Sequence, residues 1–311
     1  MNRILNKPQA NNMKEMKIKN NNIFSDIDCP ISNSFTFVKG IGLKTETTLN
    51  ELGIICWNDV IEKQCPELFP KRKWHTLCDG VNSAIEALKI LDVSQLTNLI
   101  PKTQHWKMIP SFLNQIAFLD IETTGLSPKY SHITTIAVYD GKRVHDFVKG
   151  ENLDDFPAFI SKFPAITTFY GKAFDIPFIK QEMGIDFNQI HFDICFLLKR
   201  LKITGGLKRI EKRFGISRGS LEDLDGYSAV VLWNKFKKSQ KKEYLETLLA
   251  YNNEDAINLE FLLYHTYNLL IEREHILSTP LKFPKKEIKN PFLANKRIVD
   301  EILGRRTNSY S

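Results

Sequence analysis

The chain has 311 residues, of which 42% are hydrophobic and 25% charged, as in ordinary globular proteins with room for one large domain and a small one. No apolar run approaches the length of about 18 residues that a membrane-spanning helix requires, so none is predicted. The net charge of +7 suits a polyanionic partner such as a nucleic acid, but does not by itself establish one.

The N-terminal segment from Met1 to Asn22 is rich in asparagine and lysine and has no apolar core, which argues against a secretory signal. We expect residues 1–30 to form a disordered leader. The five cysteines have irregular spacings and no Cys-x-x-Cys, which indicates reduced thiols and a cytoplasmic protein. A zinc site is conceivable but lacks the usual second pair of ligands; its candidates are Cys65, His75 and Cys78.

Residues 31–100 are expected to form a small helical module. It contains the tight turn Gly40-Ile41-Gly42, which is followed by a segment with helical apolar spacing. The turn and helix resemble a helix-hairpin-helix element, in which backbone amides approach a nucleic-acid phosphate and a lysine adds positive charge. The resemblance implies nucleic-acid contacts at Gly40, Gly42 and Lys44. A module that only packs on the next domain is an equally good interpretation.

Residues 101–114 contain Pro101 and Pro110 and are expected to be a linker. From residue 115 onward the pattern changes to strands and helices, predicted in chain order at 116–119, 132–139, 143–149, 153–162, 165–170, 193–201, 206–214, 227–237 and 243–271. Three strands in a meander, then alternating helix and strand, then helices predict an α/β domain over 115–275 with a mixed sheet flanked by helices. Residues 276–311 are expected to be a basic, partly ordered tail.

Asp120 and Glu122 follow the apolar run 116–119 and stand two residues apart, so on an extended chain they project to the same side of a sheet. The run ends in Thr123-Thr124-Gly125, a turn signal. Burying two like charges this close together is costly unless a cation neutralises them. An isolated Asp-x-Glu is better explained as a solvated hairpin. Here the preceding apolar strand and the acids downstream favour a metal site.

Three further side chains extend this pattern. Asp175 follows Phe174 at a predicted strand-to-helix junction, and Tyr251 and Asp255 stand four residues apart in the last long helix. Because an α-helix has about 3.6 residues per turn, Tyr251 and Asp255 share one helical face. Each residue alone is better explained as a packing aromatic or a solvated acid. The set, in this order, is far more specific than any of its parts.

Together these groups resemble the three motifs of the DEDD superfamily of 3′–5′ exonucleases. The resemblance implies a ribonuclease H-like fold, with a mixed five-stranded sheet flanked by helices. The DEDDh branch would require a histidine five residues before the last aspartate, and this chain has Ala250 there. Tyr251, four residues before that aspartate, matches the DEDDy branch.

Within that branch the chain resembles the YprB-like (RNase_H_2) family of predicted exonucleases over residues 115–270. The matching runs are 119–126, 170–177, 191–193, 206–208 and 251–255. Members of that family also carry a segment like 35–62 upstream. One departure is Tyr170-Gly171, in the place where relatives often have asparagine before Gly-Lys. We expect it to have little effect on the metals.

The resemblance implies two divalent cations, Mg²⁺ or Mn²⁺, which activate a water and stabilise the leaving 3′ oxygen when the terminal phosphodiester is hydrolysed. Their implied ligands are Asp120, Glu122, Asp175 and Asp255. Tyr251 would orient the attacking water, because a phenol with a pKa of about 10 is a poor free base. The implied substrate is a single-stranded 3′ end, and the sequence does not distinguish DNA from RNA.

Residues beside the motifs are candidate nucleic-acid contacts. The resemblance implies that residues after the first motif line the pocket for the terminal nucleotide and that two lysines contact phosphates: Thr123, Thr124, Leu126, Lys172 and Lys208. The basic residues from Lys199 to Arg218 are either a binding track or a solvated helix face. His191 and Asp193 are better explained as a structural pair at a strand end than as metal ligands.

Two other functions remain open. The ribonuclease H-like fold also hosts endonucleases, which would cut a strand whose 3′ end is blocked. A catalytically silent nucleic-acid-binding protein would keep the fold without the activity. The presence of all four acids and the tyrosine disfavours this last interpretation.

Overall fold

The computed structural model describes residues 29–276, 278–283 and 289–304. Most of the expected leader, residues 1–28, lies outside this part of the chain. Its last two residues, Cys29 and Pro30, are buried, and Pro30 opens a short 3₁₀ helix, η1 (Pro30–Asn33). No helix of the described residues is long and apolar enough to cross a membrane.

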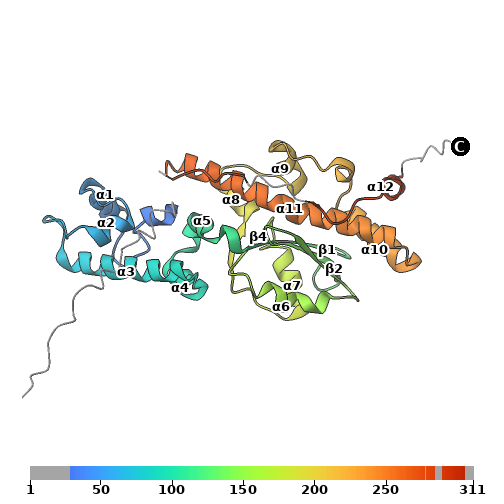
Figure 1. Cartoon of the computed structure of the whole chain (residues 1–311), viewed down its shortest axis with the longest axis horizontal. Coiled ribbons are helices and arrows are strands. Elements are labelled where there is room, and N and C mark those ends of the chain that lie inside the picture. Colours follow the sequence, from blue (N-terminus) through green and yellow to red (C-terminus); the bar gives the residue numbers. More distant parts are fainter. Residues whose placement is uncertain (1–28, 277, 284–288, 305–311) are drawn as a thin grey trace, which may run out of the picture.

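A mixed sheet of five strands forms the centre of the chain (Figure 1), which confirms the predicted fold class. The strands are β1 (Ile116–Thr123), β2 (Ile133–Tyr139), β3 (Val144–Val148), β4 (Ala165–Thr168) and β5 (Ile190–Asp193). Their spatial order is β3-β2-β1-β4-β5. The first three strands are antiparallel, whereas β4 runs parallel to both β1 and β5. Strand β1 is therefore the central strand.

Helices cover both faces of the sheet (Figure 1). One face is covered by α6 (Phe156–Ile160) and α7 (Asp175–Met183) and the other by α11 (Lys242–Arg273); around α11 lie α8 (Ile194–Arg200), α9 (Leu207–Arg213) and α10 (Gly226–Ser239). Alternate residues of β1 divide between these layers, as the two-residue period of a strand requires. Ala117, Leu119 and Ile121 pack toward α6 and α7. Ile116 and Phe118 pack in the cluster that contains α11.

The N-terminal part is helical, as predicted, and consists of η1 and the helices α1 (Leu43–Glu51), α2 (Trp57–Glu62), α3 (Lys71–Lys89) and α4 (Val93–Leu99). Its side chains close around Trp57, whose indole Nε1–H donates to the carbonyl oxygen of Ser34 at 2.8 Å. Gly40 has a φ of +83°, which favours glycine at this turn. Gly42 is the N-cap of α1 and Lys44 is exposed.

Residues 101–115 differ from an open linker. They form η2 (Lys102–Met108), α5 (Ile109–Phe112) and η3 (Leu113–Gln115). Pro101 precedes η2 and Pro110 stands in the first turn of α5, where a missing N–H breaks no helical hydrogen bond. Trp106 packs edge-on against Tyr267, with ring centroids 6.3 Å apart. The prolines therefore begin these helices, and the segment joins the module to the sheet through buried side chains.

The C-terminal segment also contains structure that its weak periodicity did not predict. Helix α12 (Lys296–Ile302) buries Ile298 and Val299 beside α10 and α11. Asn295 caps the helix by accepting from the backbone N–H groups of Arg297 and Ile298. Seven residues are too few for a clear helical period in the sequence.

Candidate active site

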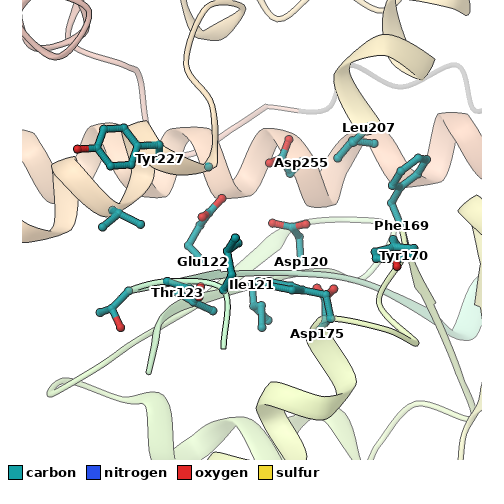
Figure 2. A pocket seen from close by; sticks show the side chains of 16 residues that line it. Asp120, Ile121, Glu122, Thr123, Phe169, Tyr170, Asp175, Leu207, Tyr227 and Asp255 are labelled. Atoms are coloured by element: carbon teal, nitrogen blue, oxygen red, sulfur yellow. Dashed lines mark hydrogen bonds between the residues drawn. The ribbon is translucent and has the colours of Figure 1, made fainter. Parts of the chain in front are cut away.

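Three carboxylates converge between β1 and α11. Asp120 and Glu122 continue the side of β1 that faces α11, and Asp255 comes from the middle of that helix, which passes over them (Figure 2). One oxygen from each of the three lies within 4.8 Å of the others. Glu122 and Asp255 are only 8% and 5% exposed. An all-oxygen, anionic group of this kind suits a hard divalent cation such as Mg²⁺ or Mn²⁺.

Asp175 is placed beside this group but is not part of it. It is the first residue of α7, is buried, and lines the same pocket as the other three acids (Figure 2). The backbone of Ile121 hydrogen-bonds to its carboxylate, so Asp175 contacts β1 from beside the convergent oxygens. The structure therefore fits a cation at three of the four predicted ligands, with the fourth at the edge of the site.

Burial favours the protonated form of these acids when no cation is bound. It raises the pKa of Asp120 and Glu122 well above their usual range, and the charges of Asp255 and Asp175 raise both further. Burial also raises the pKa of Asp175 to about 7. The pKa of Asp255 rises to about 6 through burial, although the neighbouring Arg218 opposes the rise. A cation would remove the cost that these shifts express.

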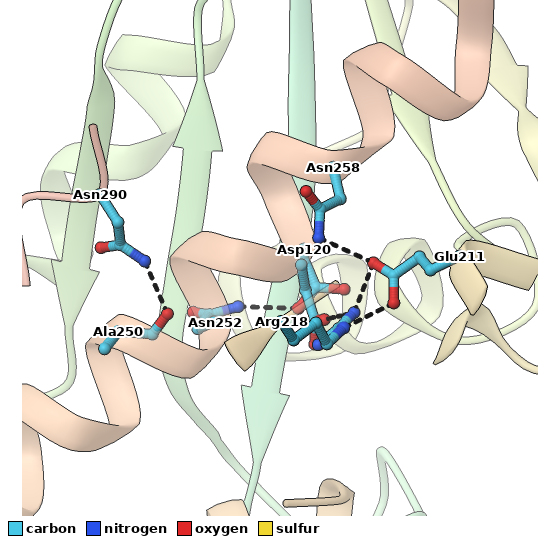
Figure 3. Close-up of polar contacts among 8 residues, drawn as sticks. Asp120, Glu211, Arg218, Ala250, Asn252, Asn258 and Asn290 are labelled. Atoms are coloured by element: carbon cyan, nitrogen blue, oxygen red, sulfur yellow. Dashed lines mark hydrogen bonds and ion pairs between the residues drawn. The ribbon is translucent and has the colours of Figure 1, made fainter. Parts of the chain in front are cut away.

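Asn252 fixes Asp120 in place. Its side-chain N–H donates to Asp120 Oδ2 at 2.7 Å (Figure 3). Its carbonyl accepts from Thr135 Oγ1 at 2.8 Å. Asn252 is fully buried, so it ties α11 to β1 and β2 at the candidate metal site. The sequence analysis missed this residue, although Asn252 stands directly after Tyr251 in the matched run.

Tyr251 is buried one helical turn before Asp255, as the spacing predicted. The ammonium of Lys208 lies 4.9 Å from its ring centroid, and the guanidinium carbon of Arg218 lies 5.8 Å away. Burial and the charge of Asp255 raise the pKa of the Tyr251 phenol far above its usual value. The hydroxyl therefore stays protonated at neutral pH.

Arg218 lies at the centre of a buried ionic group that the sequence did not predict. Its Nε and Nη2 donate to the two oxygens of Glu211 at 2.5 and 2.6 Å (Figure 3). Nη2 also pairs with Asp255. Asn258 donates to Glu211 at 3.0 Å. Arg218 is therefore buried, which fits neither a binding track nor a solvated helix face, the two possibilities left open for the basic residues from Lys199 to Arg218. Within the described residues, its Nη1 is buried without a hydrogen-bond partner.

A pocket of about 650 Å³ opens beside the acids (Figure 2). Thr123, Thr124 and Leu126, which are candidate contacts for the terminal nucleotide, are among the residues that line it. The two threonines are used locally: Thr123 Oγ1 donates to the carbonyl of Gly125, and Thr124 Oγ1 accepts from the backbone N–H of His132. Leu126 is 87% exposed and free to contact a ligand.

The other predicted contacts are spread more widely. Lys208 lies over Tyr251, next to the acids, whereas Lys172 lies on the loop after β4. The predicted contacts of the N-terminal module, Gly40, Gly42 and Lys44, are absent from the lining of this pocket. Among the described residues, the three acids form a group that could hold a metal ion, whereas Cys65, His75 and Cys78 form none.

His191 and Asp193 have the structural role that the sequence indicated. His191 Nε2 hydrogen-bonds to Thr168 Oγ1 at 2.8 Å. The carboxylate of Asp193 accepts from the backbone N–H groups of Tyr170, Lys172 and Cys195 at 2.9 to 3.1 Å. These bonds hold the loop after β4 against the start of α8.

Residues 117–267 match the family model described as the RNase_H superfamily. The matched range begins in β1 and ends in α11, so it contains the sheet and the acidic group. The fold is ribonuclease H-like. The N-terminal module and α12 lie outside the matched range.

The chain is also similar to "Uncharacterized protein YprB" of Bacillus subtilis (strain 168), with 28% identity over 187 residues. The match covers 52% of this chain and 44% of the relative, so it spans less than half of that protein. A family B DNA polymerase from the hyperthermophilic archaeon Pyrobaculum calidifontis aligns at 16% identity with a TM-score of 0.42, over 53% of this chain and 26% of the polymerase. Brucella melitensis NrnC with bound Mg²⁺ aligns at 18% identity with a TM-score of 0.35, over 53% and 78%.

Because of the buried acids, we expect the thermal stability of the protein to depend on both pH and divalent cation. In the folded state the pKa of Asp175 is about 7 and that of Asp255 about 6, both above the usual 3.8. Without metal, the folded state therefore binds more protons than the unfolded state from about pH 3.8 up to these folded values. Their contribution to stability is therefore lost as pH rises through about 6 to 7. In EDTA, Tm should fall between about pH 5 and about pH 8.

A divalent cation replaces the protons, so Mn²⁺ should raise Tm more at about pH 8 than at about pH 5. Thermal unfolding followed by circular dichroism, with Mn²⁺ and with EDTA at each pH, measures both effects. A rise in Tm with Mn²⁺ that is the same at both pH values would contradict the link between protons and metal.

Proposed function

We propose that the chain is a metal-dependent 3′–5′ exonuclease of the DEDDy type and a member of the YprB-like family, which removes nucleotides from single-stranded 3′ ends of DNA or RNA. The observation that carries the proposal is the convergence of Asp120, Glu122 and Asp255 beside a pocket, with Tyr251 one turn from Asp255. The proposed cofactors are two Mg²⁺ or Mn²⁺ ions, of which the three convergent acids would hold one and Asp175 would help to hold the other. The cytoplasmic location stays a prediction from the cysteine pattern.

In this proposal the protein's residues position the substrate and the water. The bound cations would supply a water of lowered pKa and neutralise the charge that builds up on the phosphate. Tyr251, held protonated by its surroundings, donates to or orients the attacking oxygen. Lys208 and the unpaired Nη1 of Arg218 add positive charge on the side of Tyr251.

The pocket supports an enzyme that takes a strand end. Its volume of about 650 Å³ is in the range of about 300–1,000 Å³ that encloses a small ligand. The polar end of the pocket carries the acids, and Leu126, Phe169 and Tyr227 contribute apolar wall. A terminal nucleoside would place its sugar and base against this wall and its phosphate at the acids.

The proposed contacts of the N-terminal module are a separate part of the proposal. The N-terminus of α1 has no side-chain cap, and Gly42 precedes it without a side chain, so its first backbone N–H groups are open to an anion. Gly40, Gly42 and Lys44 would then contact a backbone phosphate of the same nucleic acid.

The test uses single-stranded DNA and RNA labelled at the 5′ end, incubated with Mg²⁺, Mn²⁺ or EDTA. The proposal expects a metal-dependent ladder that shortens from the 3′ end, and no cleavage when the 3′ end is blocked. Internal cuts in the blocked strand would instead establish the endonuclease. Binding without cleavage under every metal would establish the catalytically silent protein.

Replacing Tyr251 with phenylalanine removes only the hydroxyl, and we expect kcat on a single-stranded oligonucleotide to fall by about a hundredfold. The ring and its contact with Lys208 remain, so Tm should change little. The matched control is Tyr264→Phe, which removes a buried hydroxyl from the same helix away from the acids. If the Tyr251→Phe variant is as active as Tyr264→Phe, the Tyr251 hydroxyl has no role in the reaction.

A further inference from the structure

Two aromatic side chains lie exposed beside the pocket. Tyr170, on the loop after β4, is 46% exposed, and Phe196, in the first turns of α8, is 40% exposed. Their rings are stacked, with planes at 13° and centroids 6.3 Å apart. Tyr170 also lines the pocket, next to Phe169 (Figure 2). The two rings therefore extend a flat apolar surface from the edge of the pocket outward.

Positive charge accompanies these rings. The ammonium of Lys199 lies 4.8 Å from the centroid of Phe196 and 5.4 Å from that of Tyr170. Lys172 reaches within 5.9 Å of the Phe196 ring. Exposed aromatic faces with lysines beside them combine the two groups that proteins use to bind single-stranded nucleic acid, a stacking surface for bases and cations for phosphates.

The backbone under Tyr170 is held in an unfavourable conformation. Tyr170 has a φ of +66°, in the left-handed region that non-glycine residues rarely adopt. Asp193 accepts from the N–H groups of Tyr170 and Lys172 and from Cys195 at the start of α8. A side chain at Gly171 would meet Thr168 Oγ1 at 2.3 Å, so the loop is pressed against β4. One carboxylate thus fixes the loop that carries Tyr170 to the helix that carries Phe196.

A strained backbone conformation persists only where the surrounding structure imposes it, and such residues cluster at functional sites. At Tyr170 this conformation holds a half-exposed aromatic ring, which water solvates poorly. We infer that Tyr170 and Phe196, with Lys172 and Lys199, form a stacking platform for an unpaired base of a single strand whose 3′ end occupies the pocket. The inference rests on the proposed function and adds to it a contact with an unpaired base outside the pocket, because bases inside a duplex are not free to stack on the rings.

The test measures affinity in EDTA, where no cleavage occurs, for fluorescein-labelled single-stranded oligonucleotides. Phe196→Ala should weaken binding by about 5- to 150-fold, the loss expected for one stacked base. Tyr170→Asn should act in the same direction, since asparagine tolerates the positive φ but lacks the ring. The ring-preserving variants Tyr170→Phe and Phe196→Tyr are the matched controls and should bind as the wild type does.

Two further arms complete the test. Lys199→Ala should make the dependence of log affinity on log salt shallower by about 0.7, whereas the exposed Lys238→Ala on α10 should not. A duplex of the same sequence should bind with little dependence on Phe196. Binding of the oligonucleotide by Phe196→Ala within twofold of wild type, or an equal loss with the duplex, would overturn the platform.

The failure of the platform and that of the proposed function are distinguishable. Hydrolysis of the p-nitrophenyl ester of thymidine 5′-phosphate by wild-type protein with Mn²⁺ reports the metal site without an upstream strand. If this ester is not hydrolysed and oligonucleotides are not cut, the proposed function fails. The affinities in EDTA decide the platform independently of that result.

Discussion

Replacing Asp120 with asparagine is expected to reduce hydrolysis of a single-stranded oligonucleotide by at least about a thousandfold. The variant lacks the negative charge of one of the three convergent carboxylates. A divalent cation would therefore bind weakly, and the charge of the phosphate would not be neutralised. Cleavage rates with Mn²⁺, and the rise in Tm on adding Mn²⁺, measure the two consequences separately.

The same substitution should leave the metal-free fold at least as stable as the wild type. Asparagine still offers an oxygen to the side-chain N–H of Asn252, and it removes the repulsion from Asp255, Asp175 and Glu122. The control is Glu246→Gln, which removes one exposed negative charge from α11. An Asp120→Asn protein with wild-type rates and a normal Mn²⁺ response would exclude Asp120 as a ligand.

Replacing Arg218 with methionine is expected to destabilise the metal-free protein by about 3–5 kcal/mol, which lowers Tm by about 6–20 °C. The loss is large because Glu211 and Asp255 would both remain buried without their cation. Mn²⁺ should restore more stability to this variant than to the wild type, since a bound cation compensates Asp255. Thermal unfolding with and without Mn²⁺ measures both effects.

Two controls separate pairing from packing. Arg209→Met removes an exposed arginine from the same region and should change stability by less than about 1 kcal/mol. The double variant Glu211→Leu, Arg218→Met removes both partners, and should be more stable than the sum of the single losses predicts. Strictly additive losses would show that the buried pair contributes nothing as a pair.

The sequence predicted the sheet and most of the site because their signals are local. The apolar run before Asp120 and the period of two in β1 suffice to place Asp120 and Glu122 on one face. The period of the last helix places Tyr251 and Asp255 together in the same way. What brings the strand pair to the helix pair is the packing of α11 on β1, which only the complete fold determines.

The remaining parts depend on contacts between distant segments. Glu211 and Arg218 are close in sequence, but nothing in a basic run distinguishes an arginine that turns inward to a carboxylate from one that faces water. Asn252 donates to Asp120, 132 residues earlier, and has no signal apart from its neighbour Tyr251. Residues 101–114 are predicted from the sequence to be a linker because their two prolines are interpreted as breaks, whereas both stand at helix starts.

One hydrophobic cluster runs from Ile31 in the N-terminal module through Trp106 and Phe112 to Ile271 at the end of α11. The module is therefore joined to the sheet by a continuous packed interior, and we expect it to keep a fixed position relative to the sheet. If Lys44 binds a phosphate of the same nucleic-acid strand whose 3′ end is hydrolysed, the distance from Lys44 to the acidic site is constant. Binding would then depend on strand length: a strand too short to reach from the acidic site to Lys44 would lose the contact with the N-terminal module, and its affinity would fall abruptly.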